Sequence, residues 1–485
     1  MTGAVTKMAL GADELATRTG GAWSGDWSGG LAAITVTVIE IDSRRCAASS
    51  LFAALPGQHA DGHDYVDAAA GNGAVAALVS RPVADAPCPL LMVDDVETAL
   101  TALGAAGRDA HRAAGGRLVA ITGSVGKTGS KEMLAHMLRR LGGCHANRAS
   151  FNNHLGVPLT LAALPAAAIP AVQEIGMNAP GEISNLTALA RPDIAVITRI
   201  ADSHAGFFDS LDDIAAAKAE IFDGLTTGGV AVLNADDPWF DMLAARARDA
   251  GAARIIAFGR SAAATARLIG IRGDETGMTV SADIDGTGLE FRIGMRGAHW
   301  AGNATAMLAA VAALGLDLEA AANSLRDFND LPGRGRVTNG IIDGRHITLI
   351  DDSYNAGPAS MAAAFTTLAD HPPQIMVLSD MLELGHGSAA AHAALAPAVM
   401  ALGPRLVITI GRDMAEMADG LDGPIDHVAA DTPAAASDAL HAALEDGDRV
   451  FIKGSNGSGA WRVAAVLLDG ISRPPATDVG ASHAA

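Results

Sequence analysis

The sequence predicts an α/β protein of three domains, and three observations lead to this fold class. The chain has 485 residues, about three times a typical domain of roughly 150 residues. Short apolar, β-branched runs alternate with helical stretches along most of the chain, which is typical of mostly parallel, doubly wound sheets. Hydrophobic residues make up 49% and charged residues 18% of the chain, so several cores can be buried.

The first 115 residues predict a small α/β domain. Residues 34–44 (ITVTVIEIDSR) alternate between apolar and polar side chains, as a half-buried strand does. Residues 74–81 and 89–95 are short apolar runs typical of buried strands. A helical stretch then ends at the glycine pair of residues 115–116, where we place the first domain boundary.

Residues 116–331 predict a central domain with a mostly parallel sheet. Residues 117–141 read as an apolar strand, a glycine turn and an amphipathic helix, and further strands are expected at 194–200, 229–237 and 254–259. Between residues 268 and 297 the pattern changes to hairpins with Asp-Gly and other glycine turns, so we expect an antiparallel extension of the sheet. An alanine-rich helix follows.

Residues 332–485 repeat the strand and helix alternation and predict a C-terminal Rossmann-like α/β domain. Its strands are expected at residues 347–353, 374–381, 405–411 and 449–455. The G-x-G-x-x-G fingerprint of dinucleotide binding is missing from this region.

Charge and cysteine content exclude several classes of protein. The formal net charge of −20 argues against sequence-independent nucleic-acid binding and against binding to anionic membranes. The chain has an odd number of cysteines, Cys46, Cys88 and Cys144, and no two of them have C-x-x-C spacing. This argues against a disulfide framework or a metal knuckle. We find neither a signal peptide nor an apolar run long enough for a membrane span, and we expect a soluble cytosolic protein.

The strongest local signal for chemistry is the segment TGSVGKT at residues 122–128. It departs from the standard G-x-x-x-x-G-K-[ST] loop because Ile121 occupies the outer glycine position. Gly123 and Gly126 still permit a tight turn whose N–H groups face a phosphate at a helix N-terminus. Lys127 can reach the β- and γ-phosphates of a nucleotide, and the Thr128 hydroxyl can ligate Mg²⁺.

Other polar residues follow predicted strands, where α/β sheets place functional groups. Glu174 and His204 each follow an apolar strand, and residues 351–355 and 453–455 end strands of the third domain. Near an ATP site, Glu174 can serve as a second metal ligand, or it can simply cap a loop. Lys218, taken alone, reads as an exposed lysine of a helix. The common placement of these residues at strand ends suggests one shared crevice.

Taken together, these segments resemble the Mur ligases of peptidoglycan synthesis. The chain contains, in the order found in that family, ITGSVGKTGSKEM, FNNHLGVPLTL, EIGMNAPGEI, ADSH, AKAEIF, LNADD, DDSYNAGPASM, SDMLELG and KGSNGS. The N-terminal segment IDSR…LFAALPGQHADGHDYVDAA is similar to the UDP-binding domain of two family members. The resemblance spans nearly the whole chain, and the combination of motifs is more specific than any one of them.

The resemblance implies a role for each matching residue. It implies catalytic residues Lys127, Glu174, His204 and Lys218. It implies that the nucleotide is bound by Gly123, Ser124, Val125, Gly126, Lys127, Thr128, Asn303, Arg334 and Asp352. It implies substrate contacts for Ser43, Arg44, Asp61, Gly62, His63, Asn152, Asn153, Asn355 and Ser360. It implies metal ligands Thr128, Glu174, His204 and Lys218, with Lys218 carried as a carbamate, so that a cation becomes an anion suited to Mg²⁺.

The resemblance also implies an activity, cofactors and partners. We expect an ATP-dependent ligase with two Mg²⁺ ions that joins UDP-MurNAc-tripeptide to D-Ala-D-Ala through an acyl phosphate. His204 can assist deprotonation of the incoming amine or hold a metal, and both roles stay open. We expect a cytoplasmic monomer that binds small molecules, with no nucleic acid and no membrane insertion. The third residue of the tripeptide, diaminopimelate or lysine, is left open.

Three other functions are weighed against this one. The first is a sister ligase that adds a single amino acid, which is disfavoured by the missing D-N-P-R motif and by the DDSYN segment. The second is a P-loop ATPase or nucleotide switch without ligation, which leaves the N-terminal DSR and DGHD segments unexplained. The third is an inactive binding protein, which is disfavoured because Lys127, Thr128, Glu174 and Lys218 are all present.

Four positions depart from the family pattern. Arg199 stands where the family usually has asparagine, and Trp300 replaces the asparagine after a histidine. Gly357 replaces asparagine, and Ser379 replaces glycine. We assign no catalytic role to Arg199 or Gly357. These departures concern details of metal and dipeptide contacts and leave the expected reaction class unchanged.

Overall fold

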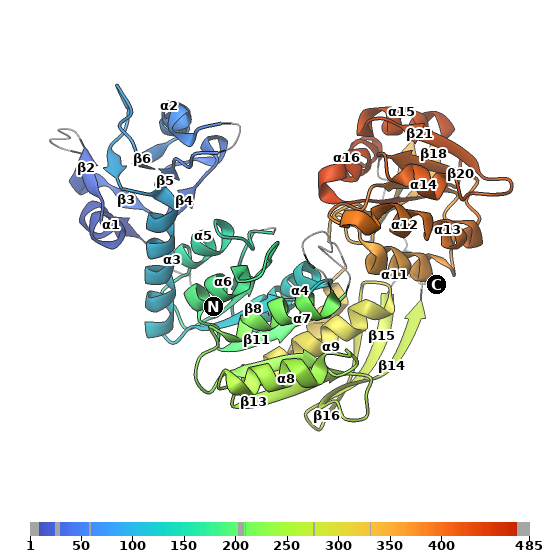
Figure 1. Ribbon diagram of the computed structural model, residues 1–485, viewed down its shortest axis with the longest axis horizontal. Coiled ribbons are helices and arrows are strands. Elements are labelled where there is room, and N and C mark those ends of the chain that lie inside the picture. Colours follow the sequence, from blue (N-terminus) through green and yellow to red (C-terminus); the bar gives the residue numbers. More distant parts are fainter. Residues whose placement is uncertain are drawn as a thin grey trace, which may run out of the picture.

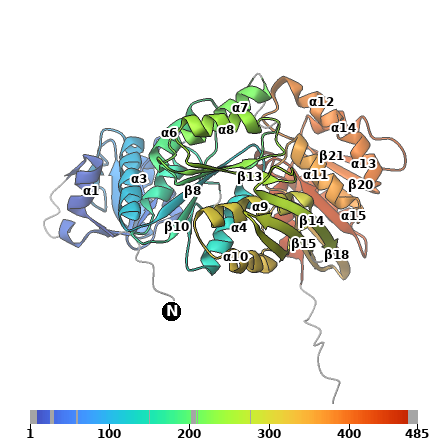
Figure 2. The ribbon, with the colours of Figure 1, turned by 90° about the horizontal axis from the view of Figure 1, so that it is seen from below.

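The computed structural model describes residues 9–24, 30–57, 60–148, 150–201, 208, 210–274, 277–329 and 331–472. Within these residues it contains sheets of five, nine and six strands and one small sheet of two strands. The three large sheets follow one another along the molecule, with the nine-stranded sheet in the middle (Figure 1, Figure 2). The first and third sheets stand on either side of it as the arms of an open V (Figure 1). The α/β fold class predicted from the sequence is confirmed.

The five-stranded sheet belongs to the N-terminal part of the chain, with strand order β2-β7-β6-β5-β4. Its neighbouring strands are parallel except for β2 and β7. The strands are β2 (Ala22–Ser24), β4 (Val38–Glu40), β5 (Ser50–Ala53), β6 (Ala74–Val79) and β7 (Leu90–Met92). The helices are α1 (Ala12–Thr19), α2 (Val66–Gly71) and α3 (Val96–Ala113).

The single strand predicted for residues 34–44 is wrong. The structure splits it into β3 (Thr35–Val36) and β4 (Val38–Glu40), which join different sheets. Strand β3 pairs with β1 (Leu10–Gly11), whereas β4 pairs with β5 at the edge of the larger sheet. The alternating pattern indicates that one face of each half is buried, but it does not specify the strand with which each half pairs.

Helix α3 leads from the first sheet to the second and packs closely against α5 (Gly156–Ala162) of the central region. Two glycines make this approach possible. A Cβ atom on Gly107 would lie 2.3 Å from the Leu161 carbonyl oxygen, and one on Gly104 would lie 2.9 Å from the Pro158 carbonyl oxygen. Leu159 of α5 belongs to the same buried cluster as the first sheet, so the two regions share a core.

Replacing Gly107 with leucine is expected to lower the free energy of unfolding by about 1–3 kcal/mol, because the added side chain has no room beside α5. Urea unfolding measures the change. Gly71→Ala is the matched control, since a Cβ atom at Gly71 meets nothing within 4 Å. We expect this control to match or slightly exceed wild-type stability. Unchanged stability of Gly107→Leu would show that the two helices do not pack this closely in solution.

The nine-stranded sheet has the order β16-β15-β14-β13-β12-β11-β8-β10-β9. Its strands are β8 (Arg117–Thr122), β9 (His145–Ala146), β10 (Pro170–Glu174), β11 (Ile194–Ile197), β12 (Val230–Asn234), β13 (Arg254–Gly259), β14 (Ala266–Asp274), β15 (Gly277–Ile284) and β16 (Thr287–Ile293). The strands from β9 to β14 are parallel, and β14, β15 and β16 are antiparallel. The predicted antiparallel extension is therefore confirmed.

Helices cover both faces of this sheet (Figure 2). Helices α4 (Lys127–Arg140), α9 (Ala298–Ala313) and α10 (Leu318–Ser324) lie on one face, and α5, α6 (Glu182–Ala190), α7 (Leu211–Ala219) and α8 (Phe240–Asp249) lie on the other. Alternate residues of β8 enter the two cores: Val119 packs with α4, and Ala120 packs on the opposite face. A central strand buried on both faces explains its unbroken apolar sequence.

The six-stranded sheet has the order β17-β18-β22-β19-β20-β21 and is parallel except for β17 and β18. Its strands are β17 (Arg336–Ile342), β18 (Arg345–Asp352), β19 (Ile375–Ser379), β20 (Leu406–Ile410), β21 (Asp426–Ala430) and β22 (Arg449–Lys453). Its helices are α11 (Pro358–Leu368), α12 (Ser388–Ala393), α13 (Ala396–Leu402), α14 (Met414–Ala418), α15 (Pro433–Ala443) and α16 (Ala460–Gly470). Separate cores on its two faces confirm a doubly covered sheet.

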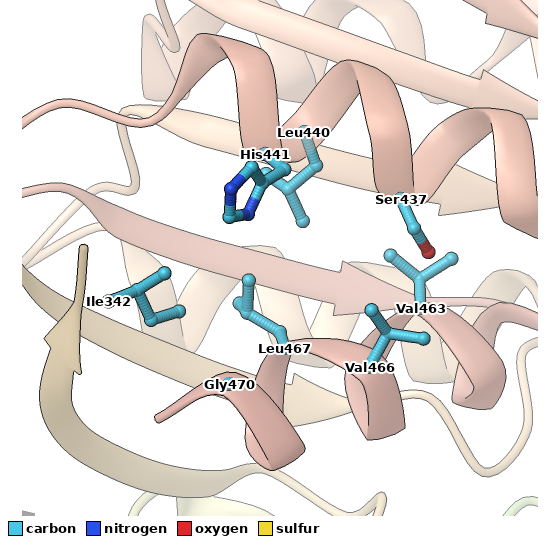
Figure 3. A pocket seen from close by; sticks show the side chains of 8 residues that line it. All are labelled: Ile342, Ser437, Leu440, His441, Val463, Val466, Leu467 and Gly470. Atoms are coloured by element: carbon cyan, nitrogen blue, oxygen red, sulfur yellow. The ribbon is translucent and has the colours of Figure 1, made fainter. Parts of the chain in front are cut away.

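Within the described ranges, no helix is both long and apolar enough to cross a membrane. A hollow of about 220 Å³ opens in the C-terminal sheet's helical layer between α15 and α16. Figure 3 shows that aliphatic side chains such as Leu440, Val463 and Leu467 surround it. This lining offers little hydrogen bonding to a charged ligand, so the hollow does not suit a charged substrate.

Candidate active site

The loop between β8 and α4 has the geometry of a phosphate-binding turn. Gly123 and Gly126 adopt positive φ angles of 144° and 86°, which favour glycine. A Cβ atom on Gly123 would lie 2.1 Å from Thr198 Oγ1. Thr198 follows β11, and its hydroxyl donates to the Val125 carbonyl oxygen at 2.6 Å. Sequence reasoning missed Thr198, and its only available signal was its position at the end of a predicted strand.

Lys127 is the first residue of α4, so the loop opens directly onto a helix N-terminus. Its ammonium folds back and donates to the carbonyl oxygens of Gly123 at 2.5 Å and Ser124 at 3.1 Å. Burial lowers the pKa of Lys127, and the nearby Glu174 carboxylate raises it in opposition. A phosphate in the loop would offer this ammonium a charged acceptor in place of neutral carbonyls.

Glu174 and Lys218 are both buried, and both interact electrostatically with Lys127. Glu174 ends β10, and its Oε1 accepts a hydrogen bond from Asn152 Nδ2 at 2.7 Å. Its Oε2 is buried and has no hydrogen-bond partner among the described residues, and the same is true of Lys218 Nζ. Lys218 is fully buried on α7 rather than exposed, so the interpretation of this lysine taken alone was wrong. Burial, followed by repulsion from Lys127, lowers the pKa of Lys218 well below its usual value.

The C-terminal domain carries a second set of charged side chains at the ends of its strands. Lys453, which ends β22, donates to Asp352 Oδ2 at 2.7 Å and to the Asn355 carbonyl oxygen at 3.0 Å. Burial raises the pKa of Asp352, and the Lys453 charge opposes this shift. The Arg334 guanidinium lies 4.1 Å from the centre of the Tyr354 ring. The sequence pattern marks Lys453 only as a strand end, and gives no sign of its pairing with Asp352.

Buried Asp351 fixes the turn that carries Arg334. Its Oδ2 accepts from the Gly333 backbone N–H at 2.9 Å, and its Oδ1 accepts from the Ser353 hydroxyl at 2.5 Å. Gly333 has a φ angle of 69°, and a Cβ atom there would lie 2.9 Å from Tyr354 Cβ. The Asp351 carboxylate thus joins backbone hydrogen bonds, such as that from the Tyr354 N–H to the Gly333 carbonyl oxygen at 2.9 Å, in holding the segment between the second and third sheets.

A cleft of about 1110 Å³ lies between the central and C-terminal domains and collects these groups. Of the residues predicted from the sequence, the cleft is lined by Ser124, Val125, Gly126, Lys127, Thr128, Asn152, Glu174, Asn303, Arg334, Asp352, Asn355 and Ser360. Seven Lys or Arg residues and five Asp or Glu residues line it, so a chain of net charge −20 presents a local excess of positive charge here. Such a balance suits an anionic nucleotide.

Other predicted site residues lie outside the cleft lining. Gly123 forms the base of the loop, and Asn153 accepts hydrogen bonds from the backbone N–H groups of Leu155 and Gly156 at the start of α5. His204 lies outside the described residues. The residues predicted to contact the nucleotide sugar, Ser43, Arg44, Asp61, Gly62 and His63, all belong to the N-terminal domain.

Asp61 and His63 form a small network in that domain. His63 is buried, its Nδ1 lies 2.6 Å from Asp61 Oδ1, and its Nε2 accepts from the Ser80 backbone N–H at 3.0 Å. Arg81 donates to Asp61 Oδ2 at 2.9 Å. The His63 backbone N–H, then Arg81, hold the pKa of Asp61 below its usual value. The network fixes the loop around Gly62.

The four departures from the family pattern have distinct surroundings. Arg199 lines the cleft, and its carbonyl oxygen accepts from the Ser124 backbone N–H at 2.8 Å. Trp300 packs on α4, where a Cβ atom on Gly129 would lie 2.8 Å from the indole ring. Gly357 is extended at the start of α11. Ser379 Oγ is buried 2.5 Å from Ser458 Oγ.

Three family models match this chain over most of its length. The model of the Mur ligase family, catalytic domain, matches residues 35–114. The Mur ligase middle domain matches residues 121–312, and the Mur ligase, glutamate ligase domain, matches residues 333–456.

Curated relatives and solved structures agree with these matches. UDP-N-acetylmuramoyl-tripeptide–D-alanyl-D-alanine ligase of Escherichia coli (strain K12) is 34% identical over 441 residues, which is 90% of this chain and 94% of that protein. The protein of the same name from Bacillus subtilis (strain 168) is 36% identical and covers 72% of this chain and 74% of its own length. MurF from Acinetobacter baumannii is 29% identical with a TM-score of 0.81, covering 96% of this chain and 99% of that chain. The fold is also that of MurF from Thermotoga maritima, solved with ADP, at 24% identity, a TM-score of 0.73 and coverage of 89% of this chain and 97% of that one. This chain belongs to the Mur ligase family.

Proposed function

We propose that this chain is an ATP-dependent ligase that joins D-alanyl-D-alanine to UDP-N-acetylmuramoyl-tripeptide, with release of ADP and phosphate. The observation that carries the proposal is the interdomain cleft. It brings Lys127 and its loop from the central domain together with Arg334 and Asp352 from the C-terminal domain. The relatives that match along 90% of the chain bear the name of this activity.

The chemistry follows from what amide formation requires. A carboxylate is a poor electrophile, so the tripeptide carboxylate oxygen attacks the γ-phosphorus of ATP, the bond to the β-phosphate oxygen breaks, and ADP leaves. The dipeptide amine then attacks the carbonyl carbon of the acyl phosphate and gives up a proton, and the tetrahedral intermediate expels phosphate. Lys127, freed from its loop carbonyls, holds the phosphate that is transferred.

Glu174 and Lys218 fit a divalent cation once Lys218 is modified. Among the described residues, no three His, Cys, Asp or Glu side chains are grouped to hold a metal. The buried Glu174 Oε2 is an oxygen donor without a partner, and the Thr128 hydroxyl lies in the same cleft. Mg²⁺ prefers such oxygen ligands, and when bound it neutralises charge on the phosphates. His204 remains a predicted ligand or proton acceptor outside the described residues.

A carbamate on Lys218 supplies the missing anion. Burial lowers the pKa of Lys218 well below its usual value, which favours the neutral, nucleophilic form of the amine. Its nitrogen bonds to the carbon of CO₂ and loses a proton, and the product is a carbamate anion with two oxygens. A cationic lysine repels Mg²⁺ and a neutral amine is a poor ligand for this hard cation, whereas the carbamate can supply oxygen ligands alongside Glu174 and Thr128.

The remaining assignments belong to the same proposal. Residues 1–115 bind the UDP-sugar, residues 116–331 bind ATP, and residues 332–485 complete the ATP site and bind the dipeptide. Asn303 reads adenine, and Asn355 and Ser360 contact the dipeptide. One solved relative, from Acinetobacter baumannii, is named for a substrate with D-glutamyl and 2,6-diaminopimelate residues. We infer that the peptide bound by this chain likewise contains D-glutamate. We place the protein in the cytoplasm as a monomer.

Phosphate release tests the ligase function. With ATP, Mg²⁺ and UDP-MurNAc-tripeptide, we expect little steady-state phosphate until D-Ala-D-Ala is added, because only the amine turns over the acyl phosphate. Mass spectrometry should then find one pentapeptide product for each phosphate. Single amino acids in place of the dipeptide are the control for a sister ligase. Phosphate release that does not depend on the dipeptide would identify an ATPase instead.

A further inference from the structure

A cluster of three charged side chains joins the N-terminal and central domains. Glu40 ends β4, and its largely buried carboxylate lies between two arginines. Arg148, which follows β9, donates from Nη1 to Glu40 Oε1 at 2.8 Å, and Arg45 Nε lies 3.8 Å from Glu40 Oε2. The arginine side chains are 57% and 52% exposed, whereas that of Glu40 is 10% exposed. Both guanidinium groups can therefore reach a ligand while Glu40 orients them.

The cluster carries an excess of positive charge. Two guanidinium groups face one carboxylate, and the neighbouring Arg44 is already paired with Asp42 at 2.8 Å. A guanidinium has five N–H donors in a planar fork that matches a carboxylate. A single contact with Glu40 leaves most donors of Arg148 to be satisfied by water or by an anion. The local charge and geometry thus fit a second carboxylate.

The cluster also lies on the path of the proposed substrate. Arg45 belongs to the same short helical turn as Ser43 and Arg44, which are assigned to the nucleotide sugar. On the other side, Asn147 precedes Arg148, and its Oδ1 accepts from the Glu174 backbone N–H at 2.9 Å. A UDP-sugar bound to the first domain must extend its peptide toward the phosphate loop near Glu174, and so it passes this cluster.

We propose that Arg148 and Arg45 bind a free carboxylate of the substrate's peptide, and that Glu40 holds the two guanidinium groups in position. This inference rests on the proposed function. A glutamyl residue within the peptide is dicarboxylic and keeps one carboxylate that no peptide bond uses. The site thus recognises the acidic peptide and not the nucleotide, and it acts on binding rather than on the reacting atoms.

Steady-state kinetics separates this role from that of a structural bridge. We expect Arg148→Ala to raise KM for UDP-MurNAc-tripeptide by about 10- to 100-fold, the range of a charged hydrogen bond, with KM for ATP and for D-Ala-D-Ala within about twofold of wild type. Glu40→Gln should raise KM for the tripeptide substrate by a smaller factor, because both arginines remain and only their positioning by the Glu40 carboxylate is weakened. An interdomain bridge without a ligand predicts equal losses from both variants, and that result would overturn the proposal.

Direct binding provides a test that does not require turnover. Calorimetry should show that Arg148→Ala lowers the affinity for UDP-MurNAc-tripeptide by the same factor and leaves the affinity for UDP at the wild-type value. Arg148→Lys should recover part of the lost affinity. An equal loss of affinity for UDP, or an unchanged affinity for the tripeptide substrate, would contradict the proposal. If wild type binds the substrate but fails to ligate the dipeptide, the proposed function fails while this measurement still decides the role of Arg148.

Discussion

Replacing Lys127 with alanine is expected to lower kcat/KM for ligation by about 10³-fold or more, because the variant loses the cation that meets the transferred phosphate. The turn should survive the loss of the two hydrogen bonds from the Lys127 ammonium, because Gly123, Gly126 and Thr198 still hold it. Phosphate release with all three substrates measures the loss. We expect Lys127→Arg to recover little, because the folded-back ammonium occupies a small space between the loop carbonyls.

Arg139→Ala is the matched control for Lys127→Ala. It removes a positive charge from the same helix at an exposed position outside the cleft lining. We expect its kcat/KM to stay within about twofold of wild type, as an exposed substitution away from the site should. Thermal melts of both variants check that folding is intact. Near-normal ligation by a folded Lys127→Ala protein would show that the loop does not act on phosphate.

Replacing Lys218 with methionine is expected to abolish ligation and to stabilise the protein. The buried Nζ has no hydrogen-bond partner among the described residues, so methionine removes an unsatisfied polar atom from the core. In buffer without bicarbonate or Mg²⁺, we expect the free energy of unfolding to rise by about 1–3 kcal/mol. Activity should fall by about 10³-fold, because the carbamate and its charge are lost. Urea unfolding and ligation assays measure the two effects.

Lys131→Met is the matched control, because Lys131 is equally buried but has partners. Its Nζ donates to the Asn147 carbonyl oxygen at 3.0 Å and pairs with Glu132 at 2.7 Å. We therefore expect Lys131→Met to destabilise the protein, in contrast to Lys218→Met. If the two variants shift stability in the same direction, the energetic cost assigned to Lys218 is wrong.

The pH dependence of stability has a defined sign. The pKa of Lys218 in the folded protein lies well below the value of 10.5 for an ordinary lysine, mainly because of burial. Between these two pKa values the unfolded chain binds a proton that the folded chain does not, so wild-type stability at this residue increases as pH rises. The advantage of Lys218→Met should therefore shrink as pH is raised from neutral toward 10.5.

The carbamate itself has a separate test. Lys218→Ala leaves a small space, and short carboxylates such as formate or acetate can supply an anion there. We expect them to restore part of the ligation activity of Lys218→Ala but not of Lys127→Ala. Full activity of Lys218→Ala without any added carboxylate would contradict the carbamate assignment.

Local patterns in the sequence predicted the fold well because they are set by periodicity and turns. The glycine loop before Lys127 was predicted from composition and spacing, and so was an antiparallel extension between residues 268 and 297, which the structure places at residues 266–293. The split of residues 34–44 was missed, because the partner of each half is chosen by tertiary packing. The burial of Lys218 was missed for the same reason: a lone lysine in a short helix carries no sign of what covers it.

Contacts between distant residues account for what was missed in the candidate site. Thr198 holds the loop across neighbouring strands, and Lys453 reaches Asp352 across about a hundred residues of sequence. The Arg148 and Glu40 pair likewise joins two domains. Each depends on strand order, which hydrophobic patterns do not specify.

The glycine contact between α3 and α5 has a consequence for which peptides the enzyme accepts. Leu159 of α5 packs in the core of the first sheet, so the N-terminal and central domains share a buried core. This shared core fixes the distance from the first domain to the phosphate loop. A fixed distance between the two sites limits the length of peptide that can span them. On the proposed function, we expect a substrate with a shorter or longer peptide to be ligated less efficiently than the tripeptide. The enzyme would thus select chain length by a rigid span, independently of the side chains that the peptide carries.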